Sequence, residues 1–146
     1  MTAVVEPVET LDRAALARLV RRFYTDVRAD VLLGPIFEPH LRAHWEAHLA
    51  RMTDFWCAAM KVQRGFRGNV YGKHMALAGI TPAHLGRWLW LWRRDSSACM
   101  DAPAAARLQY VAIGVARVMH LGWFGSLPSR AEVLALMASS GISFDV

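Results

Sequence analysis

The sequence predicts an all-α domain, because apolar residues recur at helical spacing along most of the chain and no stretch alternates convincingly as a strand would. Its 146 residues match the length of one domain that can bury a substantial core. Apolar residues make up 55% of the chain, including six Trp and seven Met, and this composition excludes a disordered protein. We therefore expect four main helices, a short helical piece and a short extra helix near the C-terminus.

The first predicted helix covers residues 11–30, with Thr10 as its N-cap. It ends before the Gly34-Pro35 pair, because proline disfavours the helical conformation in the residue that precedes it. We expect its apolar stripe to face the core. The stripe consists of Leu16, Leu19, Val20, Phe23, Tyr24 and Val27.

A second helix is predicted from about Pro39 to Lys61, since proline suits the first turn of a helix. Closely spaced glycines and an asparagine mark residues 63–72 as a loop. A short helical piece follows this loop and ends at Gly79. Loop and short piece together connect the second long helix to the third.

The third long helix is predicted over residues 81–100, with Thr81 as N-cap and Pro82 at the first helical position. Its alternating tryptophans would also suit a strand. The wider apolar register fits a helix better and leaves Trp90 off the main face. That face consists of Leu85, Trp88, Leu89 and Trp92.

The fourth long helix is predicted over residues 101–124, and the short extra helix follows Gly125. Ser129 and Glu132 have the spacing of a capping box at the start of this extra helix. The apolar face of the fourth helix consists of Leu108, Val111, Ala112, Val115, Val118 and Met119.

Charge and cysteine content narrow the class of protein. The formal net charge is +5, but the basic residues are scattered in short runs, which favours a solvated surface over a nucleic-acid footprint. Cys57 and Cys99 lie in helical patterns, so we expect buried free thiols in a reducing compartment. The N-terminal segment carries glutamates where a signal peptide would be basic, and no apolar run reaches the roughly 20 residues of a membrane span. We expect a cytoplasmic protein without membrane insertion or nucleic-acid binding.

His40, His44 and His48 follow one another at a spacing of four residues. On one continuous helix they would lie about 120°, 80° and 40° from the centre of the apolar stripe, so only His48 points inward. A helical metal-binding or sensor protein that uses all three is an alternative, although the outer two are separated by about 12 Å of helix rise. A basic helical module for an acidic partner or nucleic acid is a third alternative. An inward histidine also suits a core residue bonded to a carbonyl.

Polar groups on the apolar faces of several predicted helices point to a shared cavity. Such groups are Tyr24 on the first helix, His48 on the second, His74 after the glycine loop and Trp88 on the third long helix. Polar groups that converge in one apolar cavity are typical of a cofactor pocket.

Five segments, in this order and spacing, resemble the truncated haemoglobins and specifically their group III branch. They are FYTDVR (23–28), LGPIF (33–37), WEAHLARMTDFW (45–56), RGNVYGKHMAL (67–77) and GITPAHLGRWLWLW (79–92). Each segment alone is weak evidence, whereas five in order, each with its ligand-type residue in place, make a specific signal.

The resemblance implies the truncated-globin fold, a two-over-two helical sandwich around haem b (iron protoporphyrin IX). Residues 1–146 would then be a single globin-like domain with a core of roughly residues 11–124. Residues 127–146 have no counterpart in the resemblance and are expected to form a C-terminal extension with a short helix.

The resemblance also assigns roles to residues at the haem. His74 matches the proximal iron ligand, and Tyr24, His48 and Trp88 match residues that stabilise a ligand on the distal side. Phe37, Met52, Phe55 and Trp56 match residues that contact the porphyrin. Met75 is a further soft apolar group suited to the wall of a haem pocket.

The function implied by the resemblance is the binding of O2, NO and CO at a pentacoordinate or weakly hexacoordinate iron. A hydrogen-bond donor aimed at a negatively charged ligand contributes roughly 1.5–3 kcal/mol. Tyr24, His48 and Trp88 each offer such a donor. The same donors favour redox chemistry, such as NO oxidation or peroxide chemistry, which would require an unidentified reductase.

The remaining chemically distinctive residues receive a structural interpretation. We expect Lys73, Arg64 and Arg67, which flank the loop before His74, to face either solvent or the haem propionates. Val70 stands where many relatives carry a proline, so this loop is expected to be less rigid. Purely structural roles are expected for His84, His120, Trp90, Trp123, Cys57 and Cys99.

Overall fold

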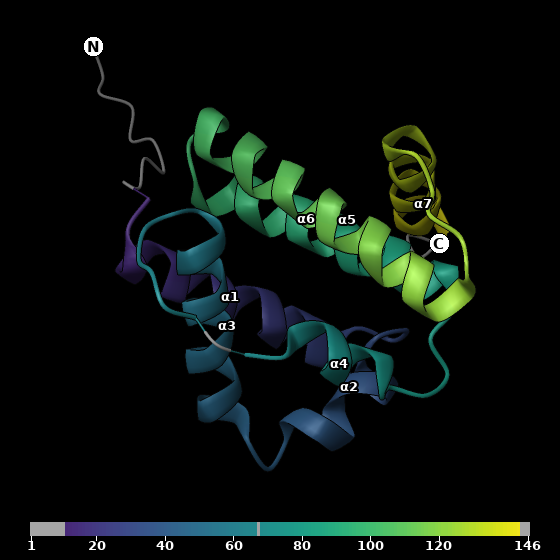
Figure 1. Cartoon of the computed structure of the whole chain (residues 1–146), viewed down its shortest axis with the longest axis horizontal. Helices are drawn as coiled ribbons and strands as arrows, with labels where there is room; N and C mark the ends of the chain where they lie inside the picture. Colours follow the sequence, from purple (N-terminus) through teal and green to yellow (C-terminus); the bar gives the residue numbers. More distant parts are fainter. Residues whose placement is uncertain (1–10, 67, 144–146) are drawn as a thin grey trace.

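The computed structural model describes residues 11–66 and 68–143, and every regular element in them is helical. Within this part of the chain, no helix is both long enough and apolar enough to cross a bilayer. The predicted all-α class is confirmed. The helices are α1 (Arg13–Ala29), α2 (Gly34–Leu41), α3 (Trp45–Ala59), α4 (Val70–Met75), α5 (Pro82–Cys99), α6 (Ala102–Phe124) and α7 (Arg130–Ser143), as Figure 1 shows.

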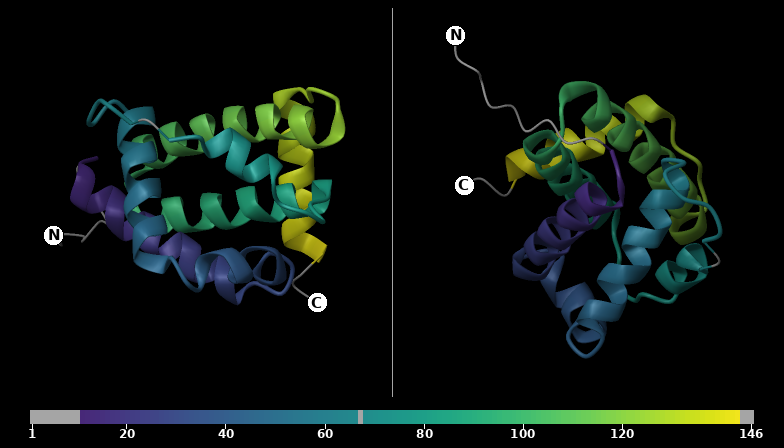
Figure 2. Two further views of the ribbon diagram at one scale, coloured as in Figure 1. Left: turned by 60° about the horizontal axis from the view of Figure 1, so that its bottom comes forward. Right: turned by 90° about the vertical axis from the view of Figure 1, so that its left-hand side faces the viewer.

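Four of the helices form two layers (Figures 1 and 2). In one layer α1 packs against α3, in the other α5 packs against α6, and α1 also packs against α5 across the layers. The short α4 packs against α6, and α7 packs against α5. This is the two-over-two arrangement that the sequence resemblance predicts.

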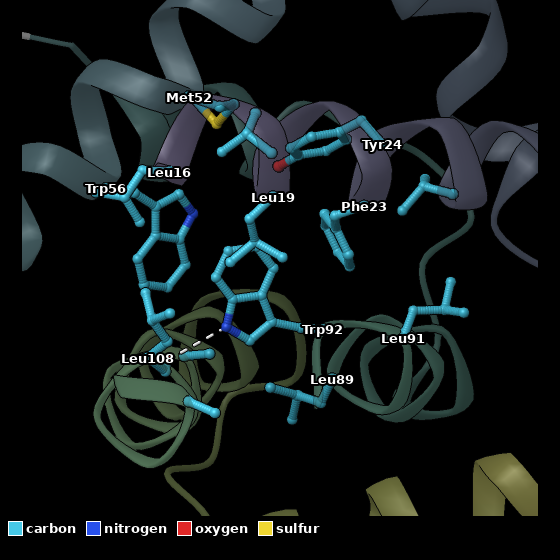
Figure 3. Close-up of a cluster of buried hydrophobic side chains, with 14 of the residues drawn as sticks. Leu16, Leu19, Phe23, Tyr24, Met52, Trp56, Leu89, Leu91, Trp92 and Leu108 are labelled. Carbon is cyan, nitrogen blue, oxygen red and sulfur yellow. Dashed lines mark hydrogen bonds between the residues drawn. The ribbon is translucent and has the colours of Figure 1, made fainter. Parts of the chain in front are cut away.

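An aromatic cluster joins the two layers (Figure 3). The rings of Trp56 on α3 and Trp92 on α5 stack with centroids 4.4 Å apart, and Phe23 on α1 meets Trp92 edge-on at 5.0 Å. The indole N–H of Trp92 donates to the carbonyl of Leu108 on α6 at 3.3 Å. Because Trp92 is only 1% exposed, this hydrogen bond satisfies a donor that burial would otherwise leave without water.

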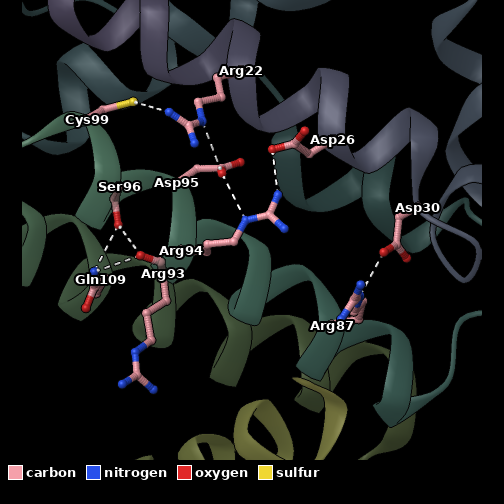
Figure 4. A network of polar contacts seen from close by, with 10 residues as sticks. All are labelled: Arg22, Asp26, Asp30, Arg87, Arg93, Arg94, Asp95, Ser96, Cys99 and Gln109. Atoms are coloured by element: carbon pink, nitrogen blue, oxygen red, sulfur yellow. Dashed lines mark hydrogen bonds and ion pairs between the residues drawn. The ribbon is translucent and has the colours of Figure 1, made fainter. Parts of the chain in front are cut away.

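One aspartate fixes the corner between α1 and α2. Asp30 follows α1 directly, and its Oδ2 accepts hydrogen bonds from the backbone N–H groups of Leu32 and Leu33, both at 3.0 Å. Its Oδ1 accepts a 2.7 Å hydrogen bond from Nε of the buried Arg87 on α5 (Figure 4). Asp30 therefore ties the turn that opens α2 to the opposite layer.

The predicted second helix, from Pro39 to Lys61, is wrong in its first part. The chain instead forms α2 and α3, and the backbone of His44 between them is not helical (φ −132°, ψ 31°). Pro35 lies in the first turn of α2, where a missing N–H needs no partner, and Pro39 lies inside that helix. A single helical wheel therefore does not describe His44 and the residues before it.

Capping residues start the helices at both ends of the chain. Asp12, rather than Thr10, is the N-cap of α1, because its Oδ1 accepts a 2.9 Å hydrogen bond from the N–H of Ala15; Thr10 lies outside the described residues. The predicted capping box of α7 is confirmed. The N–H of Ser129 donates to Glu132 Oε1 at 2.8 Å, and the N–H of Glu132 donates to Ser129 Oγ at 3.1 Å.

The buried face of α6 differs from the predicted one. Val118 is 50% exposed, whereas several alanines, whose small side chains contribute little to a hydrophobicity pattern, are buried. Alanine lets the backbones of packed helices approach closely, so burial on this helix follows side-chain size as well as polarity. The buried residues of α6 are Ala104, Ala105, Leu108, Ala112, Ala116 and Met119. Cys57 is buried as predicted, but Cys99 is only half-buried, and both are free thiols.

A charged group is buried between α1 and α5 (Figure 4). The side chain of Asp95 is fully inaccessible, and its Oδ1 lies 3.3 Å from Nε of both Arg22 and Arg94. Arg94 also binds Asp26 at 2.8 Å. Burial, reinforced by the neighbouring carboxylate of Asp26 and only partly opposed by Arg94, raises the pKa of Asp95 to about 6.

Replacing Asp95 by Asn should therefore change how stability depends on pH. The carboxyl holds its proton more tightly in the folded protein than in the unfolded chain, so deprotonation between about pH 4 and 6 favours unfolding. Over this window we expect the free energy of unfolding of the unmodified protein to fall by roughly 2–3 kcal/mol relative to that of the Asp95→Asn variant. Above about pH 6 the difference between the two proteins should no longer change with pH. Urea denaturation at a series of pH values measures this, and a pH-independent difference would contradict it.

Candidate functional site

An apolar cavity opens between the two helical layers. Together with its open mouth it encloses about 570 Å³ of space, part of which is open to solvent. All of the predicted site residues line it except Met75 and His48. Those that line it are Tyr24, Phe37, Met52, Phe55, Trp56, His74 and Trp88.

The walls contributed by α2 and α3 are flat and soft. Phe37 and Met52 are 8% and 6% exposed, so both contribute apolar surface from almost buried positions. Phe55 and Trp56 meet edge-to-face with centroids 5.4 Å apart, and this contact restrains both rings. Such a wall suits a large, flat and apolar molecule.

His74 is presented to the cavity by α4. Asn69 caps this helix by accepting a 3.0 Å hydrogen bond from the N–H of Gly72. The Nδ1 atom of His74 lies 2.7 Å from the carbonyl oxygen of Val70, so in the neutral ring Nδ1 carries the proton and donates it. Burial lowers the pKa of His74, opposed by this hydrogen bond. The ring is thus a neutral imidazole whose Nε2 lone pair is free, which is the form that binds a metal.

Tyr24 on α1 and Trp88 on α5 bring further polar atoms to the lining. Tyr24 is 3% exposed, and burial raises the pKa of its phenol, partly offset by a hydrogen bond from Trp88. An indole N–H can only donate, so the phenol oxygen accepts this bond and keeps its own O–H available as a donor. The pair therefore supplies one neutral, oriented O–H group.

His48 lies directly beside Tyr24. Their rings meet edge-to-face at 4.4 Å, and Nε2 of His48 is buried without a hydrogen-bond partner. Burial, with smaller contributions from the nearby His74 and Arg51, lowers the pKa of His48 to about 4. The ring is therefore neutral near pH 7, and its Nε2 is an unpartnered polar atom next to Tyr24, which lines the cavity.

The other two histidines of the four-residue repeat lie away from the cavity. His40 is exposed on α2, and His44 is exposed in the turn before α3. Among the described residues, no group of three or more His, Cys, Asp or Glu side chains is placed to hold a metal ion. The alternative of a metal site formed by all three histidines therefore has no geometric support in this part of the chain.

Met75, predicted as a wall residue, lies outside the cavity lining, with its Sδ against Gly122 of α6. It follows His74 directly on a helix, and successive residues point about 100° apart, so both cannot face the cavity. Lys73 and Arg64 are exposed, and Arg67 lies outside the described residues.

Two residues expected to be merely structural line the cavity instead. His84 does so while its Nδ1 accepts a 3.0 Å hydrogen bond from the N–H of Thr81 at the start of α5. Trp123 does so while its N–H donates to the carbonyl of His74 at 3.1 Å. The sequence could have predicted the position of Trp123, because it follows Val115 and Met119 at a spacing of four residues on α6. All three line the cavity.

Comparisons with known proteins agree with this geometry. The chain is 30% identical over 90 residues to the group 3 truncated haemoglobin of Campylobacter jejuni, and the match covers 60% of this chain and 71% of that protein. The chain belongs to the group 3 truncated haemoglobins. No family model matches it.

The structural comparison confirms the predicted fold of this truncated haemoglobin. The crystal structure of the group III truncated haemoglobin from Campylobacter jejuni superposes with a TM-score of 0.74 at 24% identity, covering 80% of this chain and 94% of the other. Membership of the family implies a haem cofactor and a diatomic ligand. The free Nε2 of His74 and the apolar walls of the cavity fit a metal-centred cofactor, and the unpartnered Nε2 of His48 lies beside the cavity residue Tyr24.

Replacing His48 by Leu should stabilise the ligand-free protein. A buried polar atom without a partner is unfavourable by about 1–3 kcal/mol, and leucine has no such atom. We expect the free energy of unfolding to rise by about 1–2 kcal/mol, measured by urea denaturation without added cofactor. His44→Leu, at an exposed position near the same helix, is the matched control and should change little. A lower stability of His48→Leu would refute this account.

Proposed function

We propose that this truncated haemoglobin binds haem b in the cavity, with Nε2 of His74 as the proximal ligand of the iron. The observation that carries the proposal is the hydrogen bond from Nδ1 of His74 to the carbonyl of Val70 at 2.7 Å, made at the edge of an apolar cavity. It places the proton on Nδ1 and leaves Nε2 available, while burial keeps the imidazole neutral. Phe37, Met52, Phe55 and Trp56 would cover the porphyrin with apolar surface.

Bound haem would supply an iron site for O2, NO and CO and for electron transfer. The distal residues of this chain would contribute hydrogen bonds to the bound ligand. The O–H of Tyr24 would donate to a ligand with negative charge, while the N–H of Trp88 donates to the phenol oxygen. A bond of this kind contributes roughly 1.5–3 kcal/mol. His48, neutral and beside Tyr24, would offer a further donor or act as a weak sixth ligand.

A redox role follows from the same donors. Groups that stabilise developing negative charge on oxygen favour its conversion over its simple storage, so we propose NO oxidation or peroxide chemistry as the activity. Such turnover needs electrons, and we expect a reductase as the protein partner. Support for this activity is that Tyr24 and Trp88 line the apolar cavity and that His48 contacts the Tyr24 ring.

The visible spectrum of protein expressed with a haem supply tests the proposal. We expect a Soret band in the ferric, ferrous and CO-bound forms, with coordination number read from the same spectra. His74→Ala should lose or strongly alter this band, because the iron loses its proximal nitrogen. His44→Ala is the control and should leave both the spectrum and the metal content unchanged. A Soret band that is missing, or that persists unchanged in His74→Ala, would refute the proposal.

Tyr24→Phe should accelerate the release of O2. The change removes one donor and retains the ring, so loss of roughly 1.5–3 kcal/mol of ligand stabilisation predicts an off-rate about 10- to 150-fold higher. Stopped-flow displacement of O2 by CO measures the rate. Tyr110→Phe, at a tyrosine that is 63% exposed on α6, is the matched control and should not change it. An off-rate unchanged by Tyr24→Phe means that this hydroxyl does not contact the ligand.

A further inference from the structure

The helix that carries His74 has little of its own to hold it in place. It contains only six residues, Val70–Met75, and none of them is fully buried. A helix this short is not stable in isolation, because the nucleation of a helix is repaid only over several turns. Its position must therefore come from contacts with the rest of the protein, and its main packing partner among the helices is α6.

The first of these contacts is a hydrogen bond to the backbone of His74 itself. The indole N–H of Trp123 on α6 donates to the carbonyl oxygen of His74 at 3.1 Å. The same oxygen accepts a 3.0 Å hydrogen bond from the N–H of Leu77, so it is shared between the end of α4 and the neighbouring helix. The Trp123 ring lies 6.3 Å from the His74 ring and lines the cavity.

The second contact is a close approach at the preceding residue. A Cβ atom placed on Gly122 would lie 2.3 Å from Oη of Tyr71 and 2.5 Å from Sδ of Met75, both far inside van der Waals distance. Tyr71 and Met75 belong to the two ends of α4, so the whole short helix lies over this glycine. Glycine inside a helix is unfavourable by about 1 kcal/mol relative to alanine, and here it makes room for a neighbour.

We propose that Gly122 and Trp123 form a docking site on α6 that positions the His74 imidazole, with Trp123 as a positioning residue. The inference rests on the proposed role of His74 as the iron ligand. The imidazole is held at its ring by the Val70 carbonyl and at its backbone by Trp123, so its rotation and its depth in the cavity are both restrained. A looser α4 would give a weaker and more variable bond from His74 to the iron.

The test replaces the Trp123 indole by an aromatic ring that has no N–H donor. In Trp123→Phe, the iron–histidine stretching band in the resonance Raman spectrum of the ferrous, unligated protein should shift and broaden. Transfer of haem to an excess of apomyoglobin should become about 2- to 10-fold faster, as expected for the loss of one hydrogen bond. Trp90→Phe is the matched control, because Trp90 packs against Arg87 and Arg94 and lies outside the cavity lining. It should change neither readout.

Gly122→Ala provides an independent variant that adds bulk instead of removing a donor. The flexible ends of Tyr71 and Met75 must move to admit the new methyl group, so their contacts with α6 change; because such ends move at little cost, the Raman band should shift less than in Trp123→Phe. Gly114→Ala on the same helix is the control, since its Cβ would meet only Arg130 Nη2, at an ordinary 3.6 Å. If Trp123→Phe lowers thermal stability but leaves the Raman band and the haem transfer rate unchanged, Trp123 is only a packing residue and the proposal is overturned.

Hydrogen exchange in the ligand-free protein separates this proposal from the proposed function. The amide of Leu77, which donates to the His74 carbonyl, should exchange faster in Trp123→Phe than in Trp90→Phe, whether or not haem binds. Absence of a histidine-dependent Raman band in the unmodified protein would count against His74 as the ligand. Equal exchange of this amide in both variants would count against the docking of α4.

Discussion

The hydrogen bond between Nδ1 of His74 and the carbonyl of Val70 is the interaction on which the site depends. It decides which nitrogen carries the proton, and so it decides that the cavity receives a lone pair rather than an N–H group. The bond exists only if α4 forms, because its two partners lie one turn apart on that helix. A six-residue helix forms here because Asn69 caps it and α6 holds it.

Buried polar atoms in and around the cavity differ in whether they have a hydrogen-bond partner. Trp92 lies in the core behind the cavity, donates to the Leu108 carbonyl and helps to hold the layers together. Tyr24 is paired at its oxygen and keeps a free O–H, and His48 has a buried nitrogen without a partner. A buried nitrogen without a partner is unfavourable for stability, and in the proposed function His48 would use it at the distal side of the haem.

The charged groups between α1 and α5 fix the relative position of two helices that line the cavity. Asp30 and Arg87 join the α1–α2 corner to α5, and Asp95 is buried a few turns away with Arg22 and Arg94 beside it. α1 carries Tyr24 and α5 carries Trp88, so these ion pairs fix the two helices whose side chains must meet. A buried carboxylate is weak evidence for stability, and its value here lies in holding the two helices in register.

Much of the fold and of the site was determined by the sequence alone. The spacing of apolar residues identified α1, α5 and α6, and cap residues such as Ser129 marked a helix start, because both signals act within a few residues of chain. The chemistry of Tyr24, His74 and Trp88 also follows from their identity and their faces. The sequence already placed His40 and His44 away from the core, but that α2 and α3 are separate helices depended on tertiary structure. The corner between α1 and α2 is likewise fixed by Asp30 through Arg87, 57 residues further on, and no local pattern records that contact.

The same distinction explains Trp123, Met75 and Val118. Each suits its helix locally, and only the packing of one helix against another decides which faces the cavity, a neighbour or solvent. The sequence by itself therefore determined which helices form and which chemical groups they carry. Tertiary structure alone decided where the chain turns, how α4 rests on α6 and which tryptophan reaches the backbone of His74, because those outcomes depend on contacts between residues far apart in the chain.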